Sequence, residues 1–221
     1  MINSIIFDFD GVLVESVDIK TRAFARLFEP EGQSVMARVV EFHLQNAGVS
    51  RFDKFRYIYE HILERPLTTE RFDELCKHFA DLVVNEVSQA PYVSGALEFL
   101  DNFAISAYKC FVSTATPQAE IEQIIRHRHM GKYFKAVHGA PKKKSAIVQE
   151  ILETHGIAPE TAVYVGDAMS DYKAASVNHV PFIARIRGDI EIFNGDIFDG
   201  ITCIKIPDLT ELYQAINSLN H

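Results

Sequence analysis

The sequence predicts an α/β fold: a doubly wound parallel sheet with helices on both faces, interrupted by an all-helical insert. Short apolar, β-branched runs recur along the 221 residues, and helical patterns separate most of them. That alternation is typical of a parallel sheet covered by helices. Between the first and second runs, about a hundred residues carry hardly any strand pattern. We therefore expect a helical insert early in the chain.

The expected strands are the apolar runs, taken in chain order. They are residues 2–7, 110–113, 136–138, 162–165, 182–184 and 202–206. Two helical faces mark the insert. One carries Phe72, Leu75, Phe79, Leu82 and Val83, and the other carries Phe55, Ile58, Tyr59 and Ile62.

The limits of the insert follow from these patterns. Pro91 comes just before the next helical stripe and marks where the chain returns to the sheet. We expect residues 16–90 to form a small helical domain of their own. Residues 1–15 and 91–221 would then form the core that contains the sheet.

The acidic balance of the chain restricts its partners. A formal net charge of -8 argues against binding to nucleic acid, whose phosphates would be repelled. A small phosphorylated metabolite, held by a few local cations, remains compatible with that charge. Residues 1–14 carry no basic segment, and Asp8 and Asp10 break their apolar runs. We therefore expect no signal peptide, no membrane span and no membrane partner, and the oligomeric state stays open.

The three cysteines indicate a reducing compartment. Cys76, Cys110 and Cys203 lie far apart in apolar contexts and form no CxxC motif. We expect them to be reduced core residues and not disulfide or zinc ligands. A cytoplasmic protein fits this use of cysteine best.

Polar side chains follow four of the expected strands. They are Asp8 and Asp10, Ser113 and Thr114, the lysine run at 142–144, and Asp167 with Asp171 four residues later. In open parallel sheets, ligands bind beyond the carboxyl ends of the strands, where these side chains would meet. Several carboxylates at one point would repel each other unless a cation lay between them. Hard oxygen ligands of this kind select Mg²⁺.

The same residues resemble the four motifs of the haloacid dehalogenase superfamily. The quoted stretches are "DFDGV" at residues 8–12, Ser113 after a strand, a downstream lysine, and "GDAMSD" at residues 166–171. Their order and strand-end contexts match over essentially the whole chain. The resemblance, to the group of phosphoglycolate phosphatase and β-phosphoglucomutase, implies a Rossmann-like core and makes the insert the helical cap of that group.

The resemblance also implies roles for the strand-end carboxylates. Asp8 would be the nucleophile that forms an aspartyl-phosphate, and Asp10 would be the general acid and then the general base. Mg²⁺ would be bound by the Asp8 side chain, the Asp10 backbone carbonyl and Asp167. Asp171 would be either a further ligand or a partner that orients one.

The resemblance assigns the remaining core residues to the phosphoryl group. Ser113 would donate a hydrogen bond to a phosphoryl oxygen, with Thr114 also contacting the substrate. A lysine would neutralise the charge of the transition state. The stretch "HGAPKKKSAIVQEIL" resembles relatives in which the third residue after the proline is this cation, so Lys144 is favoured over Lys142 and Lys143.

Substrate choice is expected to lie in the insert. The stretch "NAGVSRFDKF", residues 46–55, resembles the specificity loop of this group, with Gly48 at the turn and with Arg51 and Lys54 as substrate contacts. A guanidinium suits a phosphate or carboxylate because it binds two oxygens at once. The alternative is that Ser50 only caps a helix and that Arg51 and Lys54 face water.

Three functions remain open on the sequence alone. The leading one is a magnesium-dependent phosphatase that hydrolyses a small phosphomonoester of the phosphoglycolate or sugar phosphate type. The alternatives are a sugar phosphomutase of the β-phosphoglucomutase type and a non-catalytic phosphate-binding regulatory protein. Asp10 separates the chain from the superfamily's dehalogenases, which lack this acid. Lys20 stands where the sugar phosphomutases typically place a histidine, and this difference argues against a phosphomutase.

Overall fold

A six-stranded parallel sheet forms the centre of the protein. The computed structural model describes residues 1–104, 106–188 and 201–220. The strands are β1 (Ser4–Phe7), β2 (Lys109–Pro117), β3 (Phe134–Ala140), β4 (Ala162–Gly166), β5 (Phe182–Arg185) and β6 (Cys203–Ile206). They pair in the order β3-β2-β1-β4-β5-β6, with every pair parallel, so all six expected strands are present. The order reverses at β1, and this is where ligands bind in open sheets.

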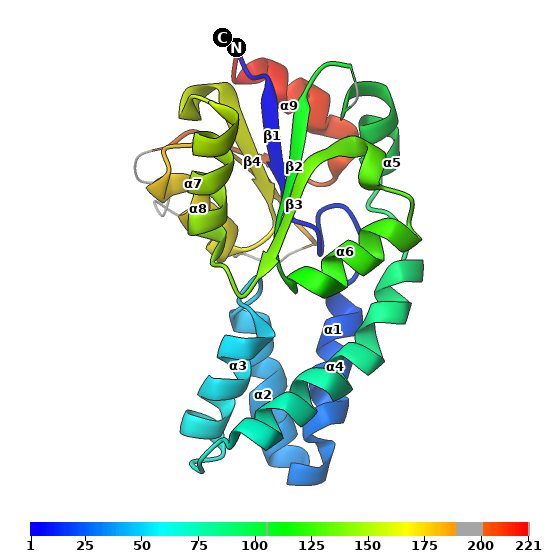
Figure 1. Ribbon diagram of the computed structural model, residues 1–221, viewed down its shortest axis with the longest axis vertical. Helices are drawn as coiled ribbons and strands as arrows, with labels where there is room; N and C mark the ends of the chain where they lie inside the picture. The colour runs from blue at the N-terminus through cyan, green and yellow to red at the C-terminus, as the bar shows by residue number, and fades with distance from the viewer. Residues whose placement is uncertain (105, 189–200, 221) are drawn as a thin grey trace.

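Helices cover both faces of the sheet, as the sequence predicts. The helices of the core are α5 (Ala96–Phe99), α6 (Gln118–His127), α7 (Lys144–His155), α8 (Met169–Val177) and α9 (Leu212–Ser218). Figure 1 shows α7 and α8 on one face of the sheet and α5 and α9 on the other. A separate buried apolar cluster fills the space on each face, which gives the parallel sheet its dry environment. None of the described helices has both the length and the apolar composition needed to cross a bilayer.

The insert after β1 is helical: residues 16–90, all described, form helices joined by turns and contain no strand. Its long helices are α1 (Val17–Phe28), α2 (Gln33–Gln45), α3 (Arg51–Tyr57) and α4 (Thr69–Gln89). The side chains of Ser50 and Thr68 accept hydrogen bonds from the backbone N–H groups of Asp53 and Arg71 and so begin α3 and α4. Rings of Phe24 and Phe79, 4.8 Å apart between centroids, pack at its centre.

Short helical turns complete the chain. They are the 3₁₀ turns η1 (Glu29–Glu31), η4 (Gly131–Tyr133), η5 (Pro159–Thr161) and η6 (Leu209–Glu211), and the π-helical turns η2 (Ile58–Ile62) and η3 (Leu100–Ala104). The turn η2 continues α3 directly, and η3 continues α5. The regular part of these two helices is therefore shorter than the apolar stripes of the sequence indicate.

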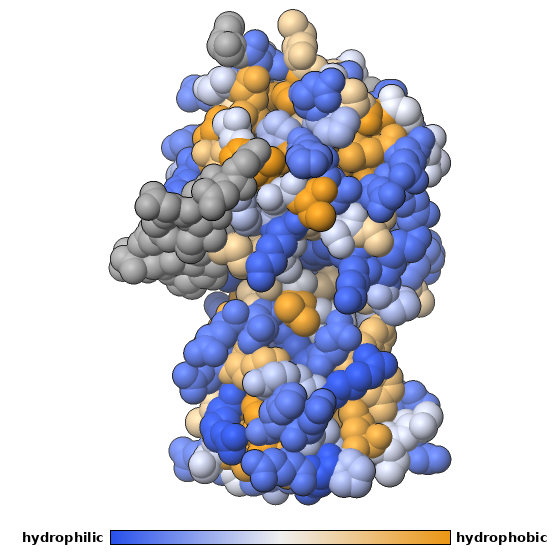
Figure 2. All heavy atoms as spheres, turned by 90° about the vertical axis from the view of Figure 1, so that its left-hand side faces the viewer, coloured by the Kyte–Doolittle hydropathy of each residue, from blue (hydrophilic) through white to orange (hydrophobic). Residues whose placement is uncertain are grey.

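Two adjacent chain segments, at Glu15 and at Pro91, join the helical insert to the core. The backbone N–H of Glu15 donates to the carbonyl of Pro91 at 3.0 Å, so the outgoing and returning chains lie side by side. Arg128, just after α6, donates from Nη1 to the carbonyls of Val87, Ser88 and Ala90 at the end of α4. Figure 2 shows the narrow waist at this junction. A waist of this kind is where two parts of a protein can move relative to each other.

Candidate active site

The carboxyl ends of β1, β2 and β4 border a cavity of about 440 Å³ that the helical insert covers. Because β1 lies between β2 and β4, the loops that follow these strands leave the sheet at neighbouring positions. The predicted site residues that line the cavity are Asp8, Asp10, Thr114 and Asp167 from the core, and Gly48, Arg51 and Lys54 from the insert. The structure thus brings residues more than a hundred positions apart in the sequence to one enclosed space.

Asp8, Lys144 and Asp171 form a buried cluster beside this cavity. Lys144 Nζ lies 2.9 Å from Asp8 Oδ2 and 2.6 Å from Asp171 Oδ1. Burial opposes the charge of Lys144, but the two carboxylates together raise its pKa above the ordinary value. Burial raises the pKa of Asp8 well above the usual range; Lys144 opposes this rise, and the neighbouring carboxylates add to it. The crowding of carboxylates around Asp8 favours a second cation.

Three carboxylates have the arrangement of a metal site. One oxygen from each of Asp8, Asp167 and Asp171 lies within 4.8 Å of the other two, and all three residues are buried. Burial raises the pKa of Asp167 to about 6, although Arg187 opposes the shift. Asp167 Oδ2 has an ion pair with Arg187 Nε at 3.1 Å but no hydrogen bond among the described residues. A buried, unsatisfied carboxylate oxygen in an all-oxygen set fits a hard divalent cation.

Asp171 is already held by other groups. Its Oδ1 accepts hydrogen bonds from Lys144 Nζ and, at 2.8 Å, from the Tyr164 hydroxyl, and its Oδ2 accepts from the Ala168 backbone N–H. Asp8 and Asp167 have fewer hydrogen bonds and so more free lone pairs. Of the two roles expected for Asp171, the geometry therefore favours the second: it orients Lys144 and does not itself bind the metal.

Asp10 lies in a different electrostatic environment from Asp8. Its Oδ2 lies 2.5 Å from Lys20 Nζ and accepts from the Thr116 hydroxyl at 2.8 Å, while its Oδ1 accepts from the Ser16 hydroxyl at 2.6 Å. Burial by itself would raise the pKa of Asp10, but Lys20 and these hydrogen bonds lower it. Because Lys20 belongs to α1, the insert contributes directly to the environment of this core carboxylate.

Toward the end of β2, the hydroxyl-bearing residues that line the cavity are Thr114 and Thr116, which differs from our expectation for Ser113. Ser113 is fully buried, does not line the cavity, and its Oγ has no hydrogen-bond partner among the described residues. Thr114 lines the cavity, and its hydroxyl lies 3.4 Å from Asp10 Oδ2. The cavity lining on β2 begins at Thr114 and continues through Pro117, and the pairing of β2 with β3 is irregular between Ser113 and Pro117. The strand also continues to Pro117, beyond the apolar run.

The lysine run separates into one buried and two exposed residues. Lys144 is 7% exposed, whereas Lys142 and Lys143 are exposed. Lys142 pairs with Glu150 on the outside of α7. The geometry thus agrees with the choice of Lys144 as the cation nearest to Asp8.

The loop of Gly48 packs against the core. Gly48 has a φ of +75°, which glycine adopts readily. A Cβ atom at this position would lie 2.1 Å from Ser170 Oγ and 3.4 Å from Lys144 Nζ. Only a residue without a side chain lets the loop approach α8 so closely, so Gly48 acts at a turn, as the sequence predicts.

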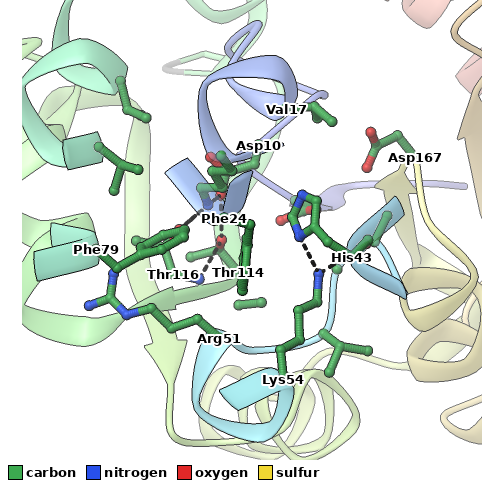
Figure 3. Close-up of a pocket in the computed structure, with 18 of the residues that line it drawn as sticks. Asp10, Val17, Phe24, His43, Arg51, Lys54, Phe79, Thr114, Thr116 and Asp167 are labelled. Carbon is green, nitrogen blue, oxygen red and sulfur yellow. Dashed lines mark hydrogen bonds and ion pairs between the residues drawn. The ribbon is translucent and has the colours of Figure 1, made fainter. Parts of the chain in front are cut away.

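Arg51 and Lys54 are buried, and they have different partners. Ser50 does cap α3, but Arg51 is 7% exposed and Lys54 is 2% exposed, so neither side chain faces water. Both terminal nitrogens of Arg51 bond the carboxylate of Glu120 on α6. Lys54 Nζ instead lies 2.9 Å from His43 Nδ1. In Figure 3, Lys54 extends toward His43, whereas Arg51 extends toward Phe79.

The remaining wall of the cavity is largely apolar. Its apolar lining includes Phe24, Phe79, Val83, Val87 and Ile124, which come from α1, α4 and α6. Charged groups thus gather near the strand ends and the loop of Gly48, and hydrocarbon faces them. Pockets of this kind orient a small ligand with a few polar contacts.

Sequence reasoning missed the contacts that depend on distant partners. Glu120 is 69 residues from Arg51, and Thr116 is 106 residues from Asp10. Arg187 likewise has no motif around it that points to Asp167. Lys20 had a signal, since it is a lysine on the first helix after the nucleophile motif, but its pairing with Asp10 follows only from the fold.

A family comparison agrees with this arrangement. The family model described as haloacid dehalogenase-like hydrolase matches residues 5–185, which is most of the chain. The chain therefore belongs to this family, and the protein is an enzyme of the hydrolase class. The matched range includes every site residue that the sequence predicts.

Individual relatives have several activities. A phosphorylated carbohydrates phosphatase of Thermotoga maritima is 27% identical over 86% of this chain and 87% of its own length. A 5'-nucleotidase of Pseudomonas aeruginosa is 26% identical over 81% of this chain and 80% of its own length. Among solved structures, a β-phosphoglucomutase of Clostridium difficile has a TM-score of 0.79 at 17% identity and covers 99% of this chain and 97% of its own. That last likeness concerns the fold.

Proposed function

We propose that the protein is a magnesium-dependent phosphatase that hydrolyses small phosphomonoesters of the sugar phosphate type through an aspartyl-phosphate. One observation carries the proposal: Asp8 and Asp10 follow the central strand, face one covered cavity and have separate cationic partners, Lys144 and Lys20. The relative from Thermotoga maritima, a phosphatase of phosphorylated carbohydrates, supports the substrate class.

The first step is attack by Asp8 on phosphorus. The Asp8 carboxylate forms the new P–O bond while the bond from phosphorus to the ester oxygen breaks, and the leaving alkoxide takes a proton from Asp10. Lys144, 2.9 Å from Asp8 Oδ2, stabilises negative charge on the phosphoryl oxygens, and the hydroxyl of Thr114 donates to one of them. Lys20 lowers the pKa of Asp10, so Asp10 is ionised before the substrate binds. Asp10 must therefore take up a proton as the substrate binds, before it can protonate the leaving alkoxide.

The second step regenerates the enzyme. Asp10, now ionised, removes a proton from water, and the oxygen of that water attacks phosphorus. The bond from phosphorus to Asp8 breaks, which releases inorganic phosphate and restores the carboxylate. Ser16, Thr116 and Lys20 hold the Asp10 carboxylate in place through both proton transfers.

The buried carboxylates fit Mg²⁺. Asp8 and Asp167 would bind it through side-chain oxygens, with the Asp10 carbonyl as a further oxygen ligand. When bound, Mg²⁺ neutralises the repulsion between these carboxylates and the substrate phosphate. Arg187 also neutralises part of the Asp167 charge.

We also propose that residues 16–90 act as a cap over a core of residues 1–15 and 91–221. The Arg51–Glu120 and Lys20–Asp10 pairs join the cap to the core and close the cavity. Substrate entry requires both pairs to separate or the waist to open. The three free cysteines, Cys76, Cys110 and Cys203, are compatible with the cytoplasmic location that we propose.

The proposal is tested by phosphate release from a panel of phosphomonoesters. The panel contains 2-phosphoglycolate, hexose phosphates and nucleoside monophosphates, each assayed with Mg²⁺ and with chelator. Wild type is compared with Asp8→Asn and, as a matched control, with Asp18→Asn, which alters an exposed aspartate on α1. We expect metal-dependent release that only Asp8→Asn abolishes. Rearranged hexose phosphates without released phosphate would favour the phosphomutase, and no reaction from folded, Mg²⁺-loaded protein would contradict both.

A further inference from the structure

Lys54 is a buried ammonium group with no carboxylate partner in the described parts of the chain. Its Nζ bonds His43 Nδ1 at 2.9 Å and the His43 carbonyl at 3.2 Å, and it lies 5.5 Å from the centre of the Phe24 ring. None of these groups carries a negative charge. Burying an ammonium without a counter-charge costs free energy, so the fold holds Lys54 there at some loss of stability.

The other cations at the cavity are all neutralised. Lys144 has Asp8 and Asp171, and Lys20 has Asp10. Arg51 has both of its terminal nitrogens on Glu120, so its guanidinium fork is occupied. Within residues 1–104, 106–188 and 201–220, the ammonium that lines the cavity without an acidic partner is therefore that of Lys54.

The electrostatics around Lys54 favour an incoming anion. Burial, together with the charges of Lys20 and Lys144, lowers the pKa of Lys54 to about 7. Burial also lowers the pKa of His43 to about 3, so its ring is neutral and Nδ1 accepts from the Lys54 ammonium. The ring proton is then on Nε2, which makes His43 a second donor on the same wall of the cavity.

We propose that Lys54 and His43 bind a second anionic group of the substrate, so that the preferred substrates are phosphomonoesters that also carry a carboxylate or another phosphate. This inference rests on the proposed function, because it places the reacting phosphate at Asp8 in the same cavity. The second anion supplies the counter-charge that Lys54 lacks. Arg51, held by Glu120, contributes to closing the cavity instead of binding this group.

The test compares substrates that differ by one anionic group. One pair is 2-phosphoglycolate and ethyl phosphate, in which a methyl group replaces the carboxylate; the other is a hexose bisphosphate and the hexose monophosphate. The enzymes are wild type, Lys54→Met and, as a control, Lys77→Met, which alters an exposed lysine on α4. We expect Lys54→Met to lower kcat/KM for the doubly anionic member by about 10- to 100-fold and to leave its singly anionic partner within about threefold.

The two pairs also identify the second anion. A loss confined to the 2-phosphoglycolate pair assigns a carboxylate, and a loss confined to the hexose pair assigns a phosphate. Equal losses for both members of each pair, or a wild type that prefers neither doubly anionic substrate, would overturn the inference.

A binding measurement separates this inference from the proposed function. Calorimetric titration of the Asp8→Asn protein with 2-phosphoglycolate, ethyl phosphate and both hexose phosphates needs no turnover. We expect addition of Lys54→Met to weaken binding of a doubly anionic ligand about 10-fold or more and to leave its partner unchanged. If wild type hydrolyses nothing, the proposed function fails, yet this titration still decides the role of Lys54.

Thermal unfolding tests whether Lys54 has a structural role. Removal of an uncompensated buried charge should leave the Tm of Lys54→Met equal to that of wild type or raise it by a few degrees, about 2–8 °C. A lower Tm together with equal losses for paired substrates would show that the bond to His43 serves the fold, and the inference would be wrong.

Discussion

The cavity has a floor, formed by the residues that follow the strands, and a covering wall, formed by α2 and α3. The lysines of the floor and of the wall differ in whether they are paired with carboxylates. On the floor, beyond the strand ends, each cation lies against a carboxylate: Lys144 pairs with Asp8 and Asp171, and Arg187 pairs with Asp167. On the wall formed by α2 and α3, Lys54 has only neutral hydrogen-bond partners among the described residues. The floor is thus preorganised for one chemistry, and the wall keeps a charge available for whatever enters. We therefore expect the floor to carry out the reaction and the wall to select the substrate.

The largest effect is expected on the floor, from loss of Lys144. Lys144→Met leaves Asp8 and Asp171 buried without their counter-charge and removes the cation from the reacting phosphate. We expect kcat to fall about 10²- to 10³-fold and the free energy of unfolding to fall by about 3–5 kcal/mol. Steady-state kinetics and denaturant unfolding measure the two losses, with the exposed neighbour Lys142→Met as the control. Equal behaviour of the two variants would contradict the plan of the floor.

A smaller effect is expected at the end of β2, where two successive hydroxyls face different ways. Thr114→Val removes a hydroxyl that lines the cavity and should lower kcat/KM about 10- to 100-fold for every substrate. Ser113→Ala removes a fully buried hydroxyl that has no hydrogen-bond partner among the described residues, and it should leave kcat/KM within about twofold. Kinetics of the two variants on one substrate decide between these residues. The reverse order would restore Ser113 to the site.

The wall should respond to pH in a way that the floor does not. The pKa of Lys54 is about 7, lowered by burial and by the charges of Lys20 and Lys144, so its ammonium is charged below this pH and lost above it. His43 stays neutral throughout this range, because its pKa is about 3. We expect the preference for a doubly anionic substrate over its partner to fall up to about tenfold per pH unit above 7.

Using a ratio makes that pH measurement specific. In the pair of 2-phosphoglycolate and ethyl phosphate, ionisation of Asp10 or of the reacting phosphate affects both members and largely cancels in the ratio of kcat/KM values, while the carboxylate stays ionised. In Lys54→Met the ratio should be independent of pH. A wild-type ratio that does not change between about pH 6 and 8.5 would contradict the assigned charge of Lys54.

The smallest effect is expected from the ion pair that links the wall to the core. Arg51→Met and Glu120→Gln should each lower kcat/KM about three- to tenfold, alike for every substrate, because the pair joins α3 to α6 and closes the cavity. The double variant should be no worse than either single variant. A loss after Arg51→Met that differs strongly between substrates would return Arg51 to the role that the specificity-loop resemblance implies.

The sequence predicted the floor better than the wall, for a physical reason. Asp8, Asp10 and Asp167 each follow an apolar strand, and a parallel sheet brings its strand ends together whatever the details of packing. The choice between Ser113 and Thr114 required the exact end of β2, where the apolar pattern stops before the strand does. For the aspartates and for the hydroxyls of β2, the local sequence predicts which kind of side chain follows the strand. The fold determines which of these side chains borders the cavity.

The wall depends on contacts that no local pattern encodes. Arg51 was expected to contact the substrate or face water; the structure buries it at the cavity and pairs it with Glu120, which lies on α6, 69 residues away. Lys54 and His43 lie on two helices whose packing brings them within 2.9 Å. Helical periodicity predicts that such side chains are buried or exposed, but it does not predict their partners.

The most direct test of the account is whether Asp8 becomes phosphorylated during turnover. The enzyme, with Mg²⁺ and an accepted phosphomonoester, is quenched in acid within milliseconds, and its peptides are mapped by mass spectrometry. We expect a hydroxylamine-sensitive phosphoryl group on the peptide that contains Asp8, and none in Asp8→Asn. Turnover without a phosphorylated peptide, or with the phosphoryl group on another residue, would contradict the assignment of Asp8 as the nucleophile.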